Sequence, residues 1–281
     1  MTFISYAQNF EDVLLHRALS EIENGFYIDI GAGDPVIDSV TKSFYDSGWS
    51  GINIEPNIGS YMELARYRSR DLNLMVALGH KTGKIDFWQM NHNALSTASE
   101  HLFLKHEMNG FQGKRIEVEC RTLSDICAEF AQVADIHFLK VDVEGFEREV
   151  LLGANFVDFR PWIVVVEATT PNTQVDVSKE WIQLLTEYKY EIVYKDGLNI
   201  YFLAAERKYL TEKFEYPPNV FDQFIKYDHS LNLELSIARQ ELSKINDELQ
   251  LILKSNIWVK TRFLRSIKGF FRKKNANPER S

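Results

Sequence analysis

The segment from Phe26 to Pro35 constrains the fold of this 281-residue chain more than any other stretch. Its first half, Phe26-Tyr-Ile-Asp-Ile30, combines aromatic and β-branched residues, which favour a strand covered on both faces. Gly31 and Gly33 follow, and glycine allows a sharp turn in which the backbone approaches a ligand with no Cβ atom in the way. A buried parallel strand ending in such a turn predicts an α/β fold with a ligand site at the strand end.

Two acidic residues near this turn indicate which ligand it would serve. Asp29 precedes the first glycine, where its carboxylate suits a cationic amine such as the methionyl ammonium of S-adenosylmethionine. Glu55 ends the next short strand, 24 residues after Gly31, which is the spacing at which Rossmann-type units place a carboxylate on ribose hydroxyls. A dinucleotide site would prefer G-x-G-x-x-G, and Val36 in place of the third glycine disfavours a nicotinamide cofactor.

Strand and helix patterns alternate along the rest of the chain. Apolar runs predict further core strands, and Asp196-Gly197 predicts the turn of a hairpin; the segments concerned are 52–55, 72–78, 136–142, 162–167, 190–194 and 200–204. Residues 91–113 are rich in Asn, Ser and Gly, and an irregular loop is expected there. The pattern predicts a Rossmann-like class I methyltransferase fold, with a seven-stranded, mostly parallel sheet that ends in an antiparallel hairpin.

Four motifs in this order resemble the FkbM family of S-adenosylmethionine-dependent methyltransferases. They are Phe26 to Asp34, Ser39-Val-Thr-Lys42, Gly48-Trp-Ser-Gly-Ile-Asn-Ile-Glu-Pro56 and Phe138-Leu-Lys-Val-Asp-Val-Glu-Gly145. The opening Ser5-Tyr-Ala-Gln-Asn-Phe-Glu-Asp12 is also similar to that family, so the resemblance covers residues 1–205. It implies a class I methyltransferase fold and an activity often directed to the O-methylation of sugars and other natural-product hydroxyls.

Acidic residues and one lysine gather at the ends of the fourth and fifth core strands. Lys140 and Asp142 share one face of a strand, Glu144 lies past its end, and Glu167 ends the next strand. Burial would lower the pKa of Lys140 toward use as a base; the equal alternative is an ion pair with Glu144 or Glu167. Asp142 is expected as base, metal ligand or cofactor contact, and with Glu167 it offers oxygen ligands for Mg²⁺.

The remaining site candidates are small or polar residues near predicted turns and strand ends. For the cofactor they are Gln8, Asp12, Ala32, Ser39, Thr41 and Ala77. Among these, Ser39 and Thr41 are expected to bind the methionyl carboxylate from the start of a helix. For the hydroxyls of the acceptor the candidates are His92, Asn93 and Ser96, in the predicted polar loop.

Charge divides the chain into an acidic body and a basic tail. The net charge is −8, but residues 255–281 hold eight Lys or Arg and one Glu, or +7, which leaves −15 on residues 1–254. An acidic body argues against a nucleic-acid enzyme, whose body should be basic. We therefore predict a methyltransferase domain over 1–215, a linker and heptad helix over 216–254, and a basic amphipathic tail over 255–281.

The tail segments predict two kinds of partner. Apolar residues between Leu231 and Ile252 recur at spacings of four and three, which favours a homo-oligomeric coiled coil over a single helix docked on the body. Between Ile257 and Lys274, large apolar and basic side chains interleave, as in helices that lie on anionic membranes; packing of the tail against the acidic body is the alternative.

The sequence as a whole predicts an enzyme that methylates a sugar hydroxyl of a glycan or activated sugar, in keeping with bacterial surface polysaccharide synthesis. Two other classes stay open: a non-catalytic cofactor-binding scaffold in a glycan-assembly complex, and a nicotinamide-dependent oxidoreductase. Two isolated cysteines, Cys120 and Cys127, give no disulfide framework or zinc site, and no secretory signal or membrane span is visible. A cytoplasmic location is expected, and the basic tail suggests peripheral attachment at the cytoplasmic face of the membrane.

Overall fold

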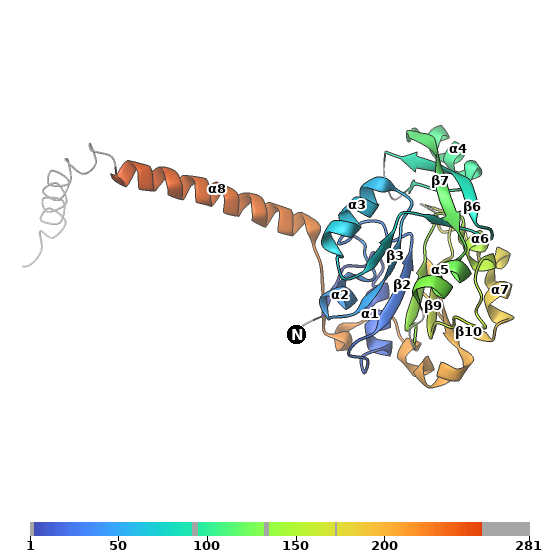
Figure 1. Cartoon of the computed structure of the whole chain (residues 1–281). Helices are drawn as coiled ribbons and strands as arrows, with labels where there is room; N and C mark the ends of the chain where they lie inside the picture. The colour runs from blue at the N-terminus through green and yellow to red at the C-terminus, as the bar shows by residue number, and fades with distance from the viewer. Residues whose placement is uncertain (1–2, 92–94, 132–134, 172, 255–281) are drawn as a thin grey trace, which may run out of the picture. The chain divides into compact units, whose positions relative to one another are not determined.

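The computed structural model describes residues 3–91, 95–131, 135–171 and 173–254. It divides into two compact units, Met1–Tyr227 and Asp228–Ser281, each of which is treated by itself. The first unit contains every strand of the described chain, and the second contains one long helix (Figure 1).

A seven-stranded sheet forms the centre of the first unit (Figure 1). Its strands, in spatial order, are β10 (Tyr190–Lys195), β11 (Asn199–Ala204), β9 (Ile163–Glu167), β8 (Phe138–Val141), β2 (Phe26–Ile30), β3 (Ser50–Ile54) and β4 (Leu72–Leu74). The pairs from β9 through β4 are all parallel, and β11 is antiparallel to both β9 and β10.

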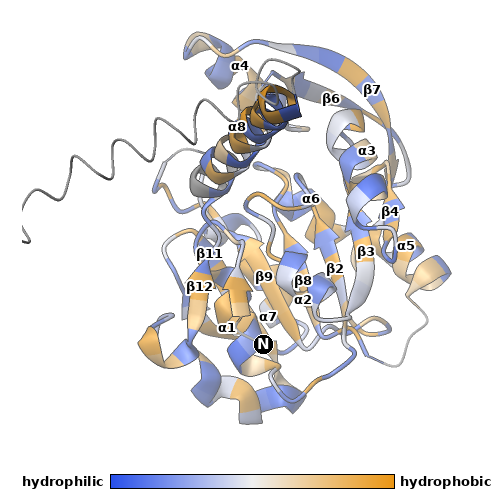
Figure 2. Ribbon diagram, turned by 90° about the vertical axis from the view of Figure 1, so that its left-hand side faces the viewer, coloured by the Kyte–Doolittle hydropathy of each residue, from blue (hydrophilic) through white to orange (hydrophobic). Residues whose placement is uncertain are grey.

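The strands are apolar on both sides because helices cover both faces of the sheet. In β9, Val164 and Val166 pack with α5 (Leu123–Phe130), α6 (Glu147–Leu152) and α7 (Ile182–Thr186). The alternate residues of the same strand, Ile163 and Val165, pack with α1 (Glu11–Ala18), α2 (Lys42–Asp46) and the 3-10 segment η3 (Ala205–Phe214). Figure 2 shows β9 as a hydrophobic strand within this sheet.

Two predicted segments differ from the structure. The predicted strand 72–78 is split: β4 extends the central sheet, whereas β5 (Ala77–Leu78) joins β6 (Gly83–Met90) and β7 (Gly113–Arg121) in a three-stranded sheet. The predicted loop 91–113 contains a helix, α4 (Glu100–Met108), whose N-terminus is capped by Ser99. A polar composition concealed this helix, because its only buried residues are Leu102 and His106.

The first unit extends beyond the boundary expected from the sequence. Short strand β12 (Phe224–Lys226) pairs in parallel with β1 (Phe3–Ser5), and Arg17 forms an ion pair with Asp222 at 2.6 Å. Residues 216–227, grouped with the tail in the sequence prediction, therefore belong to the body. The helix that follows β3 is α3 (Ile58–Tyr67), which contacts β4.

The second unit contains α8 (His229–Lys254). All of its described side chains are exposed, including Leu242 and Ile245. Within the described residues, no helix is both long and apolar enough to cross a membrane. The predicted basic tail, 255–281, lies outside the residues that the structure describes.

Candidate active site

A cavity of about 940 Å³ opens at the carboxyl ends of β2, β3, β8 and β9. Parallel α/β sheets bind ligands at this edge, because loops diverge there and leave space above the strands. Residues predicted for the site that line it are Gln8, Gly31, Gly33, Glu55, Ala77, Ser96, Lys140, Asp142, Glu144 and Glu167. The cavity thus joins the glycine turn to the acidic residues of β8 and β9.

Gly31 and Gly33 differ in how much space a side chain would have. Both have positive φ, +78° at Gly31 and +58° at Gly33. A Cβ atom on Gly31 would lie 1.7 Å from the carbonyl oxygen of Asp142, so this glycine allows two loops to touch. A Cβ atom on Gly33 would have no neighbour nearer than 4.0 Å. The close approach expected at Gly31 is therefore an approach to protein backbone.

Glu55 braces the glycine turn from the end of β3. One of its carboxylate oxygens accepts a hydrogen bond from the backbone N–H of Gly33 at 2.9 Å, and the other accepts one from Asn57 at 2.8 Å. Burial raises the pKa of Glu55 to about 7, although these two hydrogen bonds act in the opposite direction. Each oxygen keeps a second lone pair, so the predicted contact with ribose remains chemically available.

Asp29, Ser39 and Thr41 lie in one buried network beneath the turn. Thr41 donates its hydroxyl hydrogen to Asp29 at 3.0 Å, and the hydroxyl oxygens of Ser39 and Thr41 are 3.5 Å apart. The fully buried guanidinium of Arg68 donates to the Ser39 hydroxyl at 2.8 Å and to the carbonyl oxygen of Pro35. Ser39 and Thr41, predicted as cofactor contacts, here hold the loop together.

Lys140 is the cation at the centre of the site, and its predicted low pKa is wrong. Burial alone would lower the pKa of Lys140, but the nearby carboxylates of Asp142, Asp29 and Glu11 outweigh it and raise the pKa well above the ordinary value. The ammonium nitrogen lies 2.6 Å from Asp142. A permanently charged lysine paired in this way stabilises carboxylates and cannot take up a proton. The partner is Asp142, whereas the sequence suggested Glu144 or Glu167.

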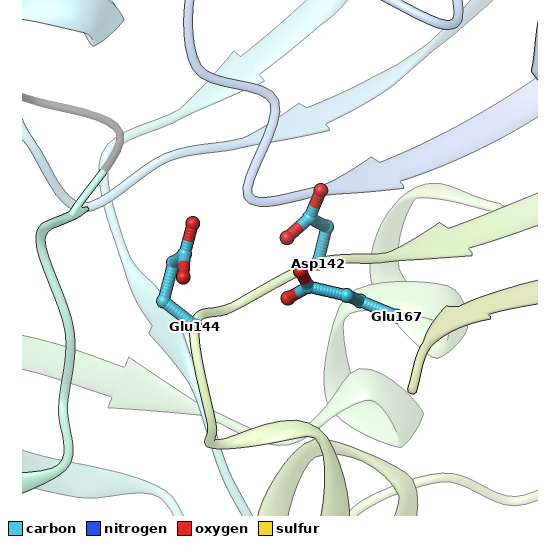
Figure 3. A group of neighbouring side chains, drawn as sticks. All are labelled: Asp142, Glu144 and Glu167. Carbon is cyan, nitrogen blue, oxygen red and sulfur yellow. The ribbon is translucent and has the colours of Figure 1, made fainter. Parts of the chain in front are cut away.

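Three carboxylates converge beside this ion pair. One oxygen from each of Asp142, Glu144 and Glu167 lies within 4.8 Å of the others. Figure 3 shows the three side chains turned toward a common space from the end of β8, the loop after it and the end of β9. We call these three residues the acidic cluster.

Within the acidic cluster, two oxygens lack any hydrogen-bond partner among the described residues. They are one oxygen each of Glu144 and Glu167, and both are buried. Glu167 is only 7% exposed, and burial together with the charges of Asp142 and Glu144 raises its pKa to about 11. Burial likewise raises the pKa of Glu144, with Asp142 and Glu147 adding to the effect. Carboxylates held so close favour a proton or a cation between them.

Side chains outside the loop hold the backbone around Glu144 by hydrogen bonds. Glu144 has a positive φ of 52°, and Gly145 follows at 86°. Glu147 accepts hydrogen bonds from the backbone N–H groups of Val143 and Gly145, at 3.2 and 3.0 Å. Thr97 donates to the carbonyl oxygen of Glu144 at 2.7 Å, which ties residues 95–99 to the acidic cluster.

The N-terminal segment contributes to the site through residues partly different from those predicted. Gln8 lines the cavity as predicted, together with Glu11, which the sequence reading missed. Glu11 accepts a hydrogen bond from Asn199 at 2.9 Å and is 2% exposed. Asp12 instead accepts hydrogen bonds from the Ser5 hydroxyl and two backbone N–H groups, so it fastens the N-terminal segment.

The remaining predicted residues divide into three groups. Ala77 and Ser96 line the cavity, and the Ser96 hydroxyl oxygen accepts a hydrogen bond from the backbone of Met90 at 3.1 Å. Ala32 is buried and uses its N–H to bridge to Ile54. His92 and Asn93 lie outside the described residues.

Three charged residues of the site, Glu11, Arg68 and Glu147, were not predicted because the sequence does not show that they are buried. Arg68 and Glu147 lie in ordinary helical surroundings in the sequence, and a charged residue there is most simply read as solvated. Glu11 stands within the predicted opening motif, where an adjacent acid, Asp12, was preferred. The only available signal was the motif itself, which did not distinguish between neighbouring carboxylates.

One comparison with known proteins, the match to a family model, assigns the chain to a family. The methyltransferase FkbM domain model matches residues 29–192, which span the glycine turn and the acidic cluster. No curated protein matches the chain. A solved structure titled crystal structure of fibrillarin/Nop5p complex is similar with 11% identity and a TM-score of 0.34, over 67% of this chain and 78% of that one. The chain belongs to the FkbM family of methyltransferases, which implies S-adenosylmethionine as the methyl donor.

Proposed function

We propose that the protein transfers a methyl group from S-adenosylmethionine to a sugar hydroxyl, on a glycan or an activated sugar used for a bacterial surface polysaccharide. The observation that carries this proposal is that the glycine turn and the acidic cluster line one cavity. We also propose that the central sheet is the Rossmann-like sheet of class I methyltransferases. Its parallel strands with one antiparallel strand between β9 and β10 support that assignment.

The glycine-turn end of the cavity suits the cofactor. Gly31 and Gly33 bring backbone to the cavity wall, and Glu55 stands beside them with lone pairs for ribose hydroxyls. Asp29 does not line the cavity, but its buried carboxylate below the turn would add negative charge that favours a cationic methionyl ammonium. When bound, S-adenosylmethionine supplies an electrophilic methyl group on a sulfonium.

The acidic-cluster end suits the acceptor. A sugar hydroxyl is a very weak acid, so a group of the protein must accept its proton as the oxygen attacks. Asp142 is our candidate for this role, because Lys140 keeps a positive charge beside it and its side chain is 33% exposed to the cavity side. Glu144 and Glu167 would orient the acceptor by accepting hydrogen bonds from its other hydroxyls.

A divalent cation is an alternative occupant of the acidic cluster. Asp142, Glu144 and Glu167 offer only oxygen ligands, which Mg²⁺ prefers, and two of those oxygens have no partner among the described residues. A bound cation would polarise the acceptor hydroxyl and ease loss of its proton. If Mg²⁺ acts here, EDTA should abolish methyl transfer and added Mg²⁺ should restore it; activity unchanged by EDTA would remove the metal from the proposal.

Methyl transfer from labelled S-adenosylmethionine to a panel of candidate glycans tests the function directly. We expect label in one acceptor and none in its deoxy analogue. Thermal stability should rise with S-adenosylhomocysteine and not with NAD, by about 2.7 kcal/mol at 100 times the Kd. Cofactor binding without transfer to any glycan would favour the scaffold alternative, and stabilisation by NAD alone would favour the oxidoreductase.

We further propose that residues 255–281 hold the enzyme at the cytoplasmic face of an anionic membrane. The support is the sequence, with +7 on this segment and Trp258, Phe263 and Phe270 among the cations. Each cation near such a surface contributes about 1 kcal/mol, and salt screens this attraction. The full chain should sediment with anionic vesicles at low salt, and deletion of 255–281 should release it. Equal sedimentation of both chains would contradict the proposal.

A further inference from the structure

Helix α8 exposes a long apolar stripe that no other described residue of its unit covers. All its described side chains are exposed, including Leu235, Leu242 and Ile252 at 46, 67 and 53%. A helix with such a stripe draws most of its stability from packing that stripe against a partner. The helix has 26 residues, about 39 Å at 1.5 Å per residue, which is long enough for three heptads.

The period of the stripe identifies the partner as another copy of α8. Between Leu235 and Ile252, one set of apolar positions (235, 238, 242, 245, 249 and 252) alternates at steps of three and four, an average period of 3.5 residues; Ile237 and Leu251 lie outside this set. That period keeps one seam facing an equal helix over many turns, whereas a helix lying on a globular surface follows 3.6. In heptad terms the a positions are Leu235, Leu242 and Leu249, and the d positions are Ala238, Ile245 and Ile252.

The charges beside the seam select the orientation. Every g position is acidic: Glu234, Glu241 and Glu248. In an antiparallel pair, g faces g, and the glutamates would repel one another. In a parallel assembly, g faces the e position of the next heptad, which places Glu234 beside Arg239 of a second copy. Parallel helices are therefore favoured.

The residue types in the seam select the number of helices. Leucine at a with isoleucine at d favours three or four helices, whereas the reverse arrangement favours two. Of the other apolar residues of α8, Leu253 at e borders the seam, whereas Ile237 and Leu251 at c lie farther round the helix; all three are exposed. We propose that α8 forms a parallel coiled coil of three or four copies of this chain.

Light scattering on the full chain tests the assembly. We expect a mass three or four times 32.7 kDa. Leu242→Glu combined with Ile245→Glu should reduce the mass to one chain, whereas Gln240→Glu with Ser243→Glu, which adds the same charges outside the seam, should leave it unchanged. The seam variant should keep the near-ultraviolet circular dichroism of the wild type, because α8 contains no aromatic ring of Phe, Trp or Tyr. A wild-type mass of one chain would overturn the proposal.

Two further variants test the number and the direction of the helices. Exchanging the leucines at a for isoleucine, and Ile245 and Ile252 for leucine, should change the assembly to two chains. Under oxidation, Leu235→Cys should cross-link copies, because only parallel helices place this end of α8 beside itself. Gln240→Cys, at an outward position, is the matched control and should not cross-link. A two-chain wild type would overturn the number, and failure of Leu235→Cys to cross-link would overturn the direction.

Discussion

Two groups of carboxylates, those at the glycine turn and those in the acidic cluster, differ in how many of their oxygens accept hydrogen bonds. At the glycine turn, Glu55 accepts hydrogen bonds on both oxygens and Asp29 accepts one from Thr41. In the acidic cluster, Glu144 and Glu167 each hold a buried oxygen with no partner among the described residues. An unpartnered buried polar atom costs roughly 1 to 3 kcal/mol, so a hydrogen bond, a proton or a cation at these two oxygens would stabilise the cluster.

The carboxylates at the glycine turn are thus held by protein groups, whereas the acidic cluster has acceptor atoms without a partner among the described residues. The glycine turn is shaped by the protein itself, through Glu55 on one side and Arg68 on the other. The acidic cluster instead keeps acceptor atoms free for hydroxyl hydrogens, a proton or a cation. Changes at the turn should therefore reduce stability and cofactor affinity, whereas changes in the cluster should reduce turnover.

The largest expected effect is on the stability of the turn. Gly31→Ala would place a Cβ atom against the Asp142 carbonyl at a positive φ, and should lower the free energy of unfolding by about 3 kcal/mol or more. Gly33→Ala, at a similar φ but with open space, is the matched control and should cost about 1 to 2 kcal/mol. Urea unfolding measures both, and equal losses would refute the claimed backbone contact.

Next in size is the effect of charge in the acidic cluster on turnover. Asp142→Asn keeps the shape of the side chain and removes its charge, and turnover should fall about 100-fold or more, as for lost acid–base or electrostatic assistance. Asp38→Asn, a cavity carboxylate outside the cluster, should retain turnover. Initial rates are compared with the acceptor that the wild type methylates. A near-normal rate for Asp142→Asn would exclude Asp142 as the proton acceptor.

A smaller effect is expected on cofactor affinity. Glu55→Ala removes the brace of the glycine turn and the predicted ribose contact, so S-adenosylhomocysteine should bind at least tenfold more weakly, or about 1.4 kcal/mol. Glu63→Ala changes an exposed carboxylate on the cavity rim and should leave the affinity within about twofold. Calorimetry that gives Glu55→Ala the wild-type affinity would remove the cofactor assignment from this end.

The last expected effect is spread over several pH units. Burial raises the pKa of Glu55 in the folded chain from 4.5 to about 7, so between these values the folded chain binds more protons than the unfolded one. The free energy of unfolding contributed by Glu55 therefore decreases as pH rises through this window, by at most about 1.4 kcal/mol per pH unit.

The variant Glu55→Gln separates the contribution of Glu55 to the pH dependence of stability from that of the histidines. His16, His106 and His137 have lowered pKa values because of burial, and they act in the opposite direction. The measurement is thus the stability of wild type minus that of Glu55→Gln, by urea unfolding from pH 5 to pH 8. The difference should shift in favour of Glu55→Gln as pH rises, and a constant difference would show that Glu55 titrates normally.

Much of the site was visible in the sequence because its motifs are local. The glycine turn, Glu55, Asp142, Glu144 and Glu167 were all predicted near the ligand, and all line one cavity. Adjacent residues in a motif must share a strand end, and parallel strands bring those ends to one edge. The family follows from the same motifs and from the match over residues 29–192.

What the sequence determined by itself were the periodic and local properties: apolar strands, the glycine turn, the family and the heptads of α8. Only the tertiary structure decided which charges meet. The pKa of Lys140 is raised because Asp142, Asp29 and Glu11 surround it. Arg68 is buried because it donates hydrogen bonds to the loop at Pro35 and Ser39. The division of residues 72–78 between two sheets was decided in the same way. Secondary structure follows from patterns of near neighbours, whereas ionisation and pairing depend on distances between residues far apart in the chain.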